Sequence, residues 1–380
     1  MSRFSAPAAG LLAVALAVSA CGTPGSSSKA DSGGTGPIKI AVIDAQSGQL
    51  SSLGAWESKG AKLAVGEWNK AGGINGRKIQ LDVFDDQGDP TVGTNLARKI
   101  SGEKYVAMIG TAESAVTLAM APTLRQAQIP NITSGQSPAM PALGSPFLFL
   151  NGPTSTTYDE TLAKYVVDKQ GIKSIAMITN NGSYGKGERD AFLKSLSSRG
   201  VKPVADQVVT TDQKDFSAAL TGIRQKNPKL IFVGSEEVEA GLIVKQARDL
   251  GIKAPFAGAA PQGTPVFAST AGAANVEGTI VSTPYLSNDV SDAAKKFAAA
   301  YQAAYGEAPE LHGAKAYDGT NIVLTALKSS GVATGQKLAD AIRATRYKGL
   351  LGDFAFDKTG VGIFATSIGT IKNGKLVAAG

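Results

Sequence analysis

The sequence is poor in the residues that most catalytic and metal sites use, with one histidine and one cysteine among 380 residues. A Ser-His-Asp triad would have to use His312, and a zinc site needs several histidine or cysteine ligands. The G-x-S-x-G motif of α/β hydrolases is missing as well. We therefore predict no catalytic residue, no metal ligand and no cofactor, and we interpret His312 as a polar residue in the loop before a helix.

Two stretches that superficially suggest nucleotide or metal binding lack the required spacing. Residues 182–187 (GSYGKG) match neither G-x-x-x-x-G-K-[ST] nor G-x-G-x-x-G, so they are interpreted as a turn from a strand into a helix. The acidic pair Asp85 and Asp86 is followed by Gly88, Asp89 and Pro90. That order is typical of a capped turn at the start of a helix.

Dense charge is also scarce. Lysine and arginine exceed aspartate and glutamate by seven (38 against 31), but the basic residues are scattered along the chain. This distribution indicates a solvated surface and no nucleic-acid partner. Hydrophobic residues make up 43% of the chain and charged residues 18%, which is a globular composition, and the length predicts two domains.

The N-terminus is typical of an exported protein. Residues 1–20 combine Arg3 with the apolar stretch 11–18, which is too short to span a bilayer and is therefore interpreted as a cleaved signal peptide. The residues that end in Cys21 resemble a bacterial lipobox. That resemblance implies lipidation of Cys21 and anchoring to the outer face of the cell membrane; the alternative is an ordinary signal peptide with a chance cysteine. Residues 21–36 are rich in glycine and serine, as expected of a flexible tether.

The body of the chain alternates strand and helix patterns, which predicts βαβ units with parallel sheets. The first series contains the strands 38–43, 78–84 and 105–109 and the helices 58–70 and 90–100. The pattern restarts near residue 155, with the strands 173–179, 204–209 and 230–233 and the helices 156–168, 187–198 and 216–225. A third section contains the strand 278–283, the helices 293–305, 314–329 and 338–344, and short strands in the tail.

An internal similarity predicts two related lobes. Residues 108–114 and 232–237 both end a strand with glycine, continue into an acidic loop and enter a helix that contains Gln-Ala. Turns after several strands carry small hydroxyl residues: Ser47, Ser114 and the segment 133–137 (TSGQS). Ligands of open α/β sheets bind outside the carboxyl ends of the strands, where helix N-termini present free N–H groups. The pattern therefore indicates a small polar or zwitterionic ligand.

Several segments resemble bacterial branched-chain amino-acid-binding proteins. They are residues 40–48 (IAVIDAQSG), 71–79 (AGGINGRKI), 85–90 (DDQGDP), 184–185 and 214–216. The resemblance covers 38–380 and implies an α/β fold of the type I periplasmic-binding class. Two Rossmann-like lobes with parallel-rich sheets flanked by helices would be joined by a three-segment hinge. Lobe 1 would hold 37–154 and 286–350, and lobe 2 would hold 155–285 and 351–380.

The resemblance also implies a set of ligand-binding residues. Ser114 matches a serine that bonds the ligand carboxylate, and Gly135 and Gln136, beside Ser134, fall near positions that grip the ammonium and the carboxylate. Leu53 occupies the place of an aromatic wall, Tyr184 matches a pocket tyrosine, and Ser235 or Glu236 falls where another tyrosine is common. The remaining predicted positions are Ser47 and Gln262.

One position departs from the family pattern. The acid that usually holds the ammonium maps to Ala260, beside Pro261 and Gln262. Either Glu236 or Glu113 would then have to supply the missing charge, or both are solvated loop acids. The ligand alternatives are a branched-chain amino acid, or a less cationic compound such as an amide, a short-chain acid or an aromatic acid.

The function that the resemblance implies is solute binding without catalysis. The ligand would bridge the lobes and favour their closure, and the permease of an ABC importer would recognise the closed form. A ligand-sensing receptor module of the same fold is the main alternative. A secreted α/β hydrolase is a further one, against which the single histidine and the missing serine motif argue.

Overall fold

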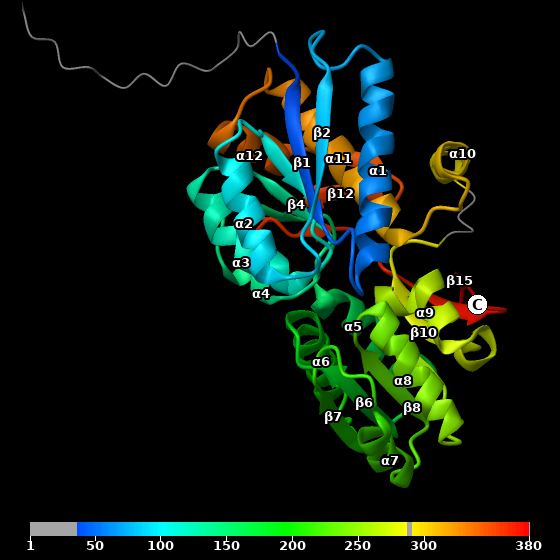
Figure 1. Ribbon diagram of the computed structural model, residues 1–380. Coiled ribbons are helices and arrows are strands. Elements are labelled where there is room, and N and C mark those ends of the chain that lie inside the picture. Colours follow the sequence, from blue (N-terminus) through cyan, green and yellow to red (C-terminus); the bar gives the residue numbers. More distant parts are fainter. Residues whose placement is uncertain (1–35, 287–290, 380) are drawn as a thin grey trace, which may run out of the picture. The chain divides into compact units, whose positions relative to one another are not determined.

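Two β-sheets flanked by helices organise the residues that the structure describes, which are 36–286 and 291–379 of the computed structural model (Figure 1). These residues belong to one unit, Ser32–Gly380. Cys21, the predicted signal peptide and nearly all of the predicted tether lie outside the described residues. No helix within the described ranges combines the length and apolarity needed to cross a bilayer.

The first sheet has five parallel strands in the order β2-β1-β3-β4-β5. Their bounds are β1 Ile38–Asp44, β2 Ile79–Asp85, β3 Ala107–Ile109, β4 Asn131–Thr133 and β5 Leu148–Leu150. The helices between them are α1 Ser51–Lys70, α2 Pro90–Ser101, α3 Ser114–Gln126 and α4 Ala139–Ala142. Side chains of β1 alternate between two cores: Ile40 and Val42 pack with α1, and Ala41 and Ile43 pack with α2 and α3. Figure 1 shows these helices on opposite sides of the sheet.

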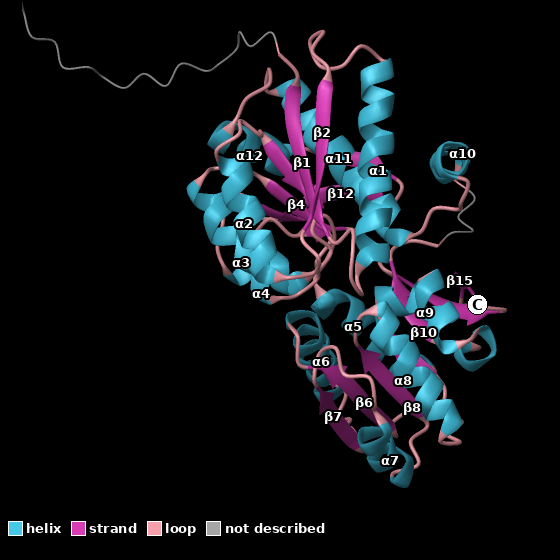
Figure 2. Cartoon of the chain, in the orientation of Figure 1, coloured by secondary structure: helices cyan, strands magenta, loops and turns pink. Residues whose placement is uncertain are grey.

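The second sheet has seven strands in the order β15-β14-β10-β9-β8-β6-β7 (Figure 2). The parallel strands are β6 Ile175–Asn180, β7 Ala205–Val209, β8 Leu230–Gly234, β9 Phe256–Gly258 and β10 Ile280–Thr283. Two antiparallel strands, β14 Ser367–Lys372 and β15 Lys375–Ala378, extend the β10 edge. The associated helices are α5 Ser155–Ala163 with a π-helical turn at Lys164–Lys169, α6 Ser183–Ser197, α7 Ser217–Gln225, α8 Glu237–Asp249 and α9 Pro265–Ala271. Single 3₁₀ turns occupy Ala260–Gly263 and Ala273–Val276.

The C-terminal part of the chain packs against the first sheet and adds two strands to the second. Helices α10 Asp292–Tyr305, α11 Leu311–Ser329 and α12 Gly335–Ala344 pack into the core of the first sheet. A small antiparallel sheet of β11 Tyr347–Gly349, β12 Gly352–Phe356 and β13 Gly362–Ile363 joins the same core. The predicted segment 351–380 is therefore divided: the Phe356 ring packs 5.1 Å from Phe149 of β5, whereas β14 and β15 belong to the second sheet.

The chain passes between the two sheets three times, after β5, after β10 and after β13. This topology confirms the predicted α/β class with two helix-flanked, parallel-rich sheets and three connecting segments. Helices α1 and α11 pack closely, and a Cβ at Gly60 would lie 2.1 Å from the carbonyl oxygen of Gly313. Glycine at residue 60 therefore lets the two backbones approach each other.

Candidate functional site

A small cavity lies where loops from the two sheets meet, and we call it the inner cavity. Its volume is about 20 Å³, which is room for about one water molecule. Loops and helices that follow strands of both sheets line it, together with one residue of α11. The lining residues are Leu53, Ala112, Glu113, Ser134, Gln136, Tyr184, Glu236, Pro261 and His312. Carboxyl-end loops of strands are the usual ligand-binding position of such sheets.

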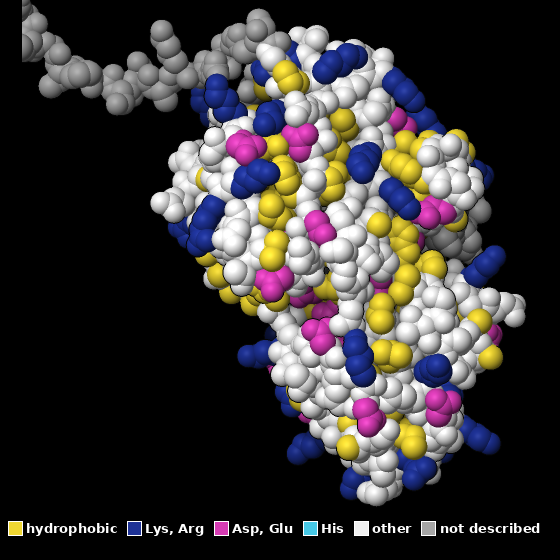
Figure 3. Space-filling model, in the orientation of Figure 1, with side chains coloured by type: hydrophobic (Ala, Val, Ile, Leu, Met, Phe, Trp, Pro, Cys, Tyr) yellow, Lys and Arg dark blue, Asp and Glu magenta, His cyan; other side chains and the backbone are white. Residues whose placement is uncertain are grey.

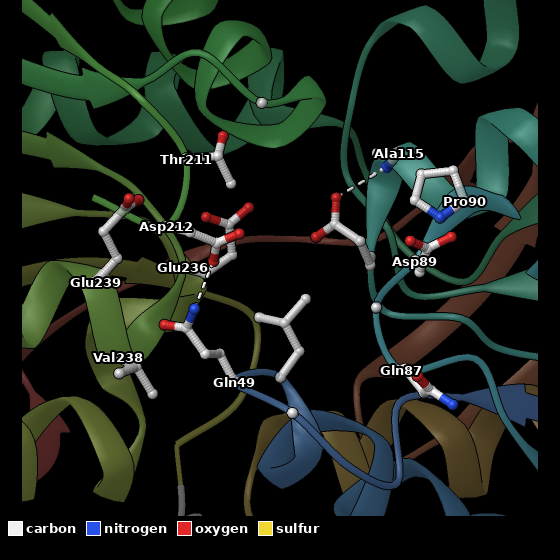
Figure 4. Close-up of a pocket in the computed structure, with 15 residues that line it drawn as sticks. Gln49, Gln87, Asp89, Pro90, Ala115, Thr211, Asp212, Glu236, Val238 and Glu239 are labelled. Carbon is white, nitrogen blue, oxygen red and sulfur yellow. Dashed lines mark hydrogen bonds between the residues drawn. The ribbon is translucent and has the colours of Figure 1, made fainter. Parts of the chain in front are cut away.

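A larger pocket of about 550 Å³, which we call the outer pocket, adjoins the inner cavity (Figure 4). The two share Glu113 and Glu236 in their linings. Figure 4 shows Glu236 and Asp212 on one side of the outer pocket and Asp89 and Pro90 on the other. The pocket is thus bounded by N-terminal ends of helices from both sheets, including α2, α3 and α8.

Five of the predicted site residues line the inner cavity: Leu53, Ser134, Gln136, Tyr184 and Glu236. Ser134 and Gln136 were predicted from their place after a strand, and Leu53, Tyr184 and Glu236 from the family resemblance. Four of them are buried, and Glu236 is half-buried. The structure therefore brings together residues that are up to 183 positions apart in the chain, from Leu53 to Glu236.

Three further predicted residues lie beside the cavity lining. Gly135 is buried between two lining residues. Ser114 is the first residue of α3, next to Glu113, and its buried Oγ has no hydrogen-bond partner among the described residues. Gln262 follows Pro261 and donates from Nε2 to the carbonyl oxygen of Ser235 at 2.8 Å. Ser114 therefore retains a free donor and acceptor that a ligand could use.

Ser47 is not brought together with the other predicted residues. It lines neither the inner cavity nor the outer pocket. Its hydroxyl donates to Asp85 at 2.6 Å, and the same carboxylate accepts hydrogen bonds from the backbone N–H groups of Gln46, Ser47 and Gln87. These bonds hold the pKa of Asp85 below its usual range despite the opposing effect of desolvation. Ser47 thus serves the turn that connects β1 to α1.

Two motif interpretations from the sequence are confirmed. Gly182 is the N-cap of α6, so the chain does turn from β6 into a helix there, although residues 183–187 already belong to the helix. Asp89 is the N-cap of α2 and accepts hydrogen bonds from the backbone N–H groups of Thr91 at 2.6 Å and Val92 at 3.0 Å. Among the described residues, no group of three or more histidine, cysteine, aspartate or glutamate side chains is arranged to hold a metal ion.

Buried charged side chains form hydrogen bonds with the loop that carries Ser134. The Ser134 hydroxyl donates to Glu57, and Lys315 Nζ donates to the Ser134 carbonyl oxygen at 2.8 Å. Burial, followed by the nearby Asp44, raises the pKa of Glu57 well above its usual value. Burial also lowers the pKa of Lys315 to about 8, against the attraction of Glu57. The loop that carries Ser134, Gly135 and Gln136 is therefore held at both a side chain and a backbone atom.

His312 is one site residue that the sequence interpretation missed. It is the second residue of α11 and lines the inner cavity, so its assignment to a loop is wrong. Its Nδ1 lies 2.9 Å from Glu310 Oε2, and its ring stacks on Trp56 with 6.3 Å between centroids. Burial lowers the pKa of His312, but the adjacent Glu310 more than offsets this and raises it overall. The one signal in the sequence was that the only histidine follows an acid by two residues.

Acidic side chains dominate the boundary between the inner cavity and the outer pocket. Burial raises the pKa of Glu113 to about 7, although the backbone N–H of Ala115 donates to its carboxylate at 2.9 Å. Burial and then the charge of Glu113 raise the pKa of Glu236 well above its usual value. Both residues were considered as sources of the charge that is missing at Ala260, and both face the shared boundary.

Comparisons with known proteins agree with this geometry. A family described as "Periplasmic binding protein" matches residues 37–375. The chain is 31% identical over 318 residues to Leu/Ile/Val-binding protein homolog 1 of Brucella suis, covering 82% of this chain and 84% of the relative. The branched-chain amino acid transporter substrate binding protein LivJ of Streptococcus pneumoniae, solved with isoleucine, is 29% identical with a TM-score of 0.84, covering 90% of this chain and 98% of that chain. A periplasmic binding protein type 1 of Bordetella pertussis shares the fold, with a TM-score of 0.83 at 23% identity over 90% of this chain and 99% of that chain.

Proposed function

Because this chain belongs to the periplasmic binding protein family, we propose that it is an extracytoplasmic solute-binding protein of an ABC importer. The resemblance to branched-chain amino-acid-binding proteins is confirmed by the relatives from Brucella suis and Streptococcus pneumoniae. The proposed solute is an amino acid of the branched-chain type or a related small carboxylate or amide. The proposed partner is the permease of the importer.

The inner cavity is the observation that carries this proposal. Strand ends of both sheets contribute to one lining, so a solute held there contacts both lobes at once. Such a solute binds the closed arrangement better than an open one and shifts the population toward closure. The cavity volume of about 20 Å³ is smaller than any amino acid, so the lobes or the lining side chains must move apart to admit the solute.

The predicted site residues fit distinct roles in this proposal. The free hydroxyl of Ser114 at the N-terminus of α3 suits a carboxylate, because helix N-termini favour negative charge. Glu236 suits an ammonium group, since its carboxylate lines the inner cavity, and Glu113 in the same lining is the alternative. Leu53 and Tyr184 supply apolar surface for the remainder of the solute. Gly135, Gln136 and Gln262 would add backbone and amide contacts.

The proposed location is the outer face of the cell membrane. Lipidation of Cys21 after removal of residues 1–20 would anchor the protein, and residues 21–36 would act as the tether. Mass spectrometry of the protein purified from membranes would test this proposal. A diacylglyceryl group on an N-terminal Cys21 supports it, and a mature N-terminus at another residue contradicts it.

The binding function is tested by thermal-shift screening of residues 37–380 against amino acids, amides and aromatic acids, followed by calorimetric titration. A solute that binds only the folded protein raises the melting temperature. Small-angle scattering then compares the radius of gyration with and without the best solute. A saturable, chemically unaltered ligand that reduces the radius supports the proposal. The absence of any ligand in the whole panel, or conversion of the ligand, contradicts it.

A further inference from the structure

Two carboxylates at the start of α8, Glu236 at the N-cap position and Glu239 in the first turn, accept hydrogen bonds from the same amide group. Asn180, the last residue of β6, donates from Nδ2 to Glu236 Oε2 at 2.5 Å and to Glu239 Oε2 at 2.6 Å. Asn180 and Glu239 are buried, and Glu236 is half-buried. No ion pair involves either glutamate among the residues that the structure describes. Lys214 slightly favours the charged form of Glu239, but its Nζ donates to Gln49 instead.

The surroundings of this pair are acidic as well. The lining of the outer pocket contains five carboxylates and no lysine, arginine or histidine: Asp89, Glu113, Asp212, Glu236 and Glu239. The whole chain, in contrast, carries a net charge of +7, and Figure 3 shows lysine and arginine spread over the visible surface. The negative charge is therefore a local property of the pocket.

Helix capping explains only part of this arrangement. Asp89 and Glu113 accept hydrogen bonds from backbone N–H groups at the starts of α2 and α3, so both have a structural role. Glu236 occupies the N-cap position of α8 but makes no side-chain capping bond. The positive end of the α8 dipole favours negative charge nearby. Burial nevertheless raises the pKa of both Glu236 and Glu239, so the helix dipole does not compensate for their desolvation.

Two buried acceptor atoms, one in the outer pocket and one in the adjoining inner cavity, have no hydrogen-bond donor among the described residues. One is Glu239 Oε1, on a side chain that lines the outer pocket and is 7% exposed. The other is Gln136 Oε1, on a side chain that lines the inner cavity and is 4% exposed. Buried acceptors normally have partners, so both atoms indicate a missing donor. Because the carboxylates of the outer pocket also have no ion-pair partner among the described residues, the site calls for a group that donates hydrogen bonds and carries positive charge.

We propose that the solute is an organic cation, such as a basic amino acid or a diamine, whose ammonium or guanidinium group binds between Glu113 and the pair Glu236 and Glu239. This inference rests on the proposed solute-binding function and replaces the branched-chain type of solute with a cationic one. A branched-chain amino acid has one ammonium and one carboxylate, so it brings no net positive charge to a site with several buried acids. A second cationic group supplies the partner that these carboxylates lack.

The two volumes are consistent with an elongated solute. The inner cavity is too small for a side chain, whereas the adjoining outer pocket of about 550 Å³ offers space lined by carboxylates. A solute whose backbone groups lie near Ser114 would extend its cationic end past Glu113 and Glu236, which line both volumes. Lysine has such an extension, and norleucine has the same chain without the terminal ammonium.

Calorimetric titration with L-lysine, L-norleucine, L-isoleucine and 1,4-diaminobutane tests the inference on the wild-type protein. Lysine or the diamine is expected to bind at least about tenfold more tightly than norleucine, because a buried charged hydrogen bond is lost in norleucine. Glu239→Gln keeps an acceptor for Asn180 and should weaken cation binding by at least about tenfold while leaving norleucine unaffected. Asp249→Asn, at the exposed C-terminal end of the same helix, is the matched control and should change neither.

The outcomes separate this inference from the proposed function. If norleucine or isoleucine binds at least as tightly as lysine and the diamine, the substrate class is wrong while the solute-binding function stands. The inference would also be overturned if calcium chloride raised the melting temperature and none of the amines did. If neither these compounds nor the wider panel of amino acids, amides and aromatic acids binds, both the inference and the function fail. Circular dichroism checks that Glu239→Gln folds, and Glu236→Gln provides a second variant.

Discussion

Glu237 provides a sharp test of how buried acids affect this protein. It is the first residue of α8, it is fully buried, and it accepts a hydrogen bond from the Ser52 hydroxyl of α1. Burial raises the pKa of Glu237 to about 7, against the opposing effects of His312 and Ser52. We predict that Glu237→Gln stabilises the ligand-free protein strongly at pH 8 and only weakly at pH 5.

The sign and size of this effect follow from proton linkage. An unfolded glutamate has a pKa of 4.5, so between pH 4.5 and about 7 the folded protein binds more protons than the unfolded chain. The free energy of unfolding therefore falls as the pH rises through this range and is constant above it. At 1.36 kcal/mol for each pKa unit, the loss is about 3 kcal/mol at pH 8 and about 1 kcal/mol at pH 5. Glutamine removes the charge and still accepts the Ser52 hydrogen bond.

Urea denaturation at pH 5 and pH 8 measures the effect. The wild type and Glu237→Gln should differ by about 2 to 3 kcal/mol more at pH 8 than at pH 5. Asp249→Asn removes an exposed carboxylate from the other end of α8 and should give a small change that is the same at both pH values. Equal changes in Glu237→Gln at the two pH values, or a less stable variant at pH 8, would refute the argument from burial.

Two further predictions concern the site and the core. Ser114→Ala should weaken binding of a carboxylate solute by about tenfold in calorimetric titration. Little stability should be lost, because the Ser114 Oγ has no hydrogen-bond partner among the described residues. An unaltered dissociation constant would show that Ser114 does not bind the solute. Phe232→Ala should lower the free energy of unfolding by about 3 to 5 kcal/mol, because the fully buried Phe232 ring stacks on Phe192 at 4.1 Å; a loss below about 1 kcal/mol in urea denaturation would contradict this.

The strands were predictable because buried parallel strands appear in sequence as short, β-branched apolar runs. The predicted strands 38–43 and 230–233 agree with β1 and β8 to within one residue. The start of α1 was harder to predict: it begins at Ser51, whereas the sequence pattern placed the helix at 58–70. Gly54 weakens the helical pattern there, but a Cβ at that position would lie 1.8 Å from the Ala45 carbonyl oxygen. Close packing against Ala45 thus requires glycine at residue 54, and that glycine weakens the helical pattern in the sequence.

The same limit applies to the tail and to the site. The prediction placed all of 351–380 in one lobe, although β12 packs on the first sheet and β14 joins the second. The contact that holds β12 there, between Phe356 and Phe149, joins residues 207 positions apart and cannot be read from the local sequence. The strand-end rule placed Ser134 and Gln136 at the inner cavity, since it depends only on the order of strands and turns, and the family resemblance supplied Leu53, Tyr184 and Glu236. The strand-end rule misplaced Ser47, whose hydroxyl is engaged by Asp85, and it missed His312, which arrives from α11.

Buried acids connect the stability of the empty protein to its proposed ligand. Glu113, Glu236 and Glu239 all have a raised pKa because they are desolvated, so the ligand-free fold is less stable wherever they are charged. Buried carboxylates that destabilise the ligand-free protein are retained where they serve binding. A cation bound between them would stabilise their charged forms and so offset the free-energy cost of desolvation. At low pH, protons neutralise these carboxylates in the ligand-free protein. A cationic solute must therefore displace them, so its affinity should rise over the same pH range in which the stability of the empty protein falls.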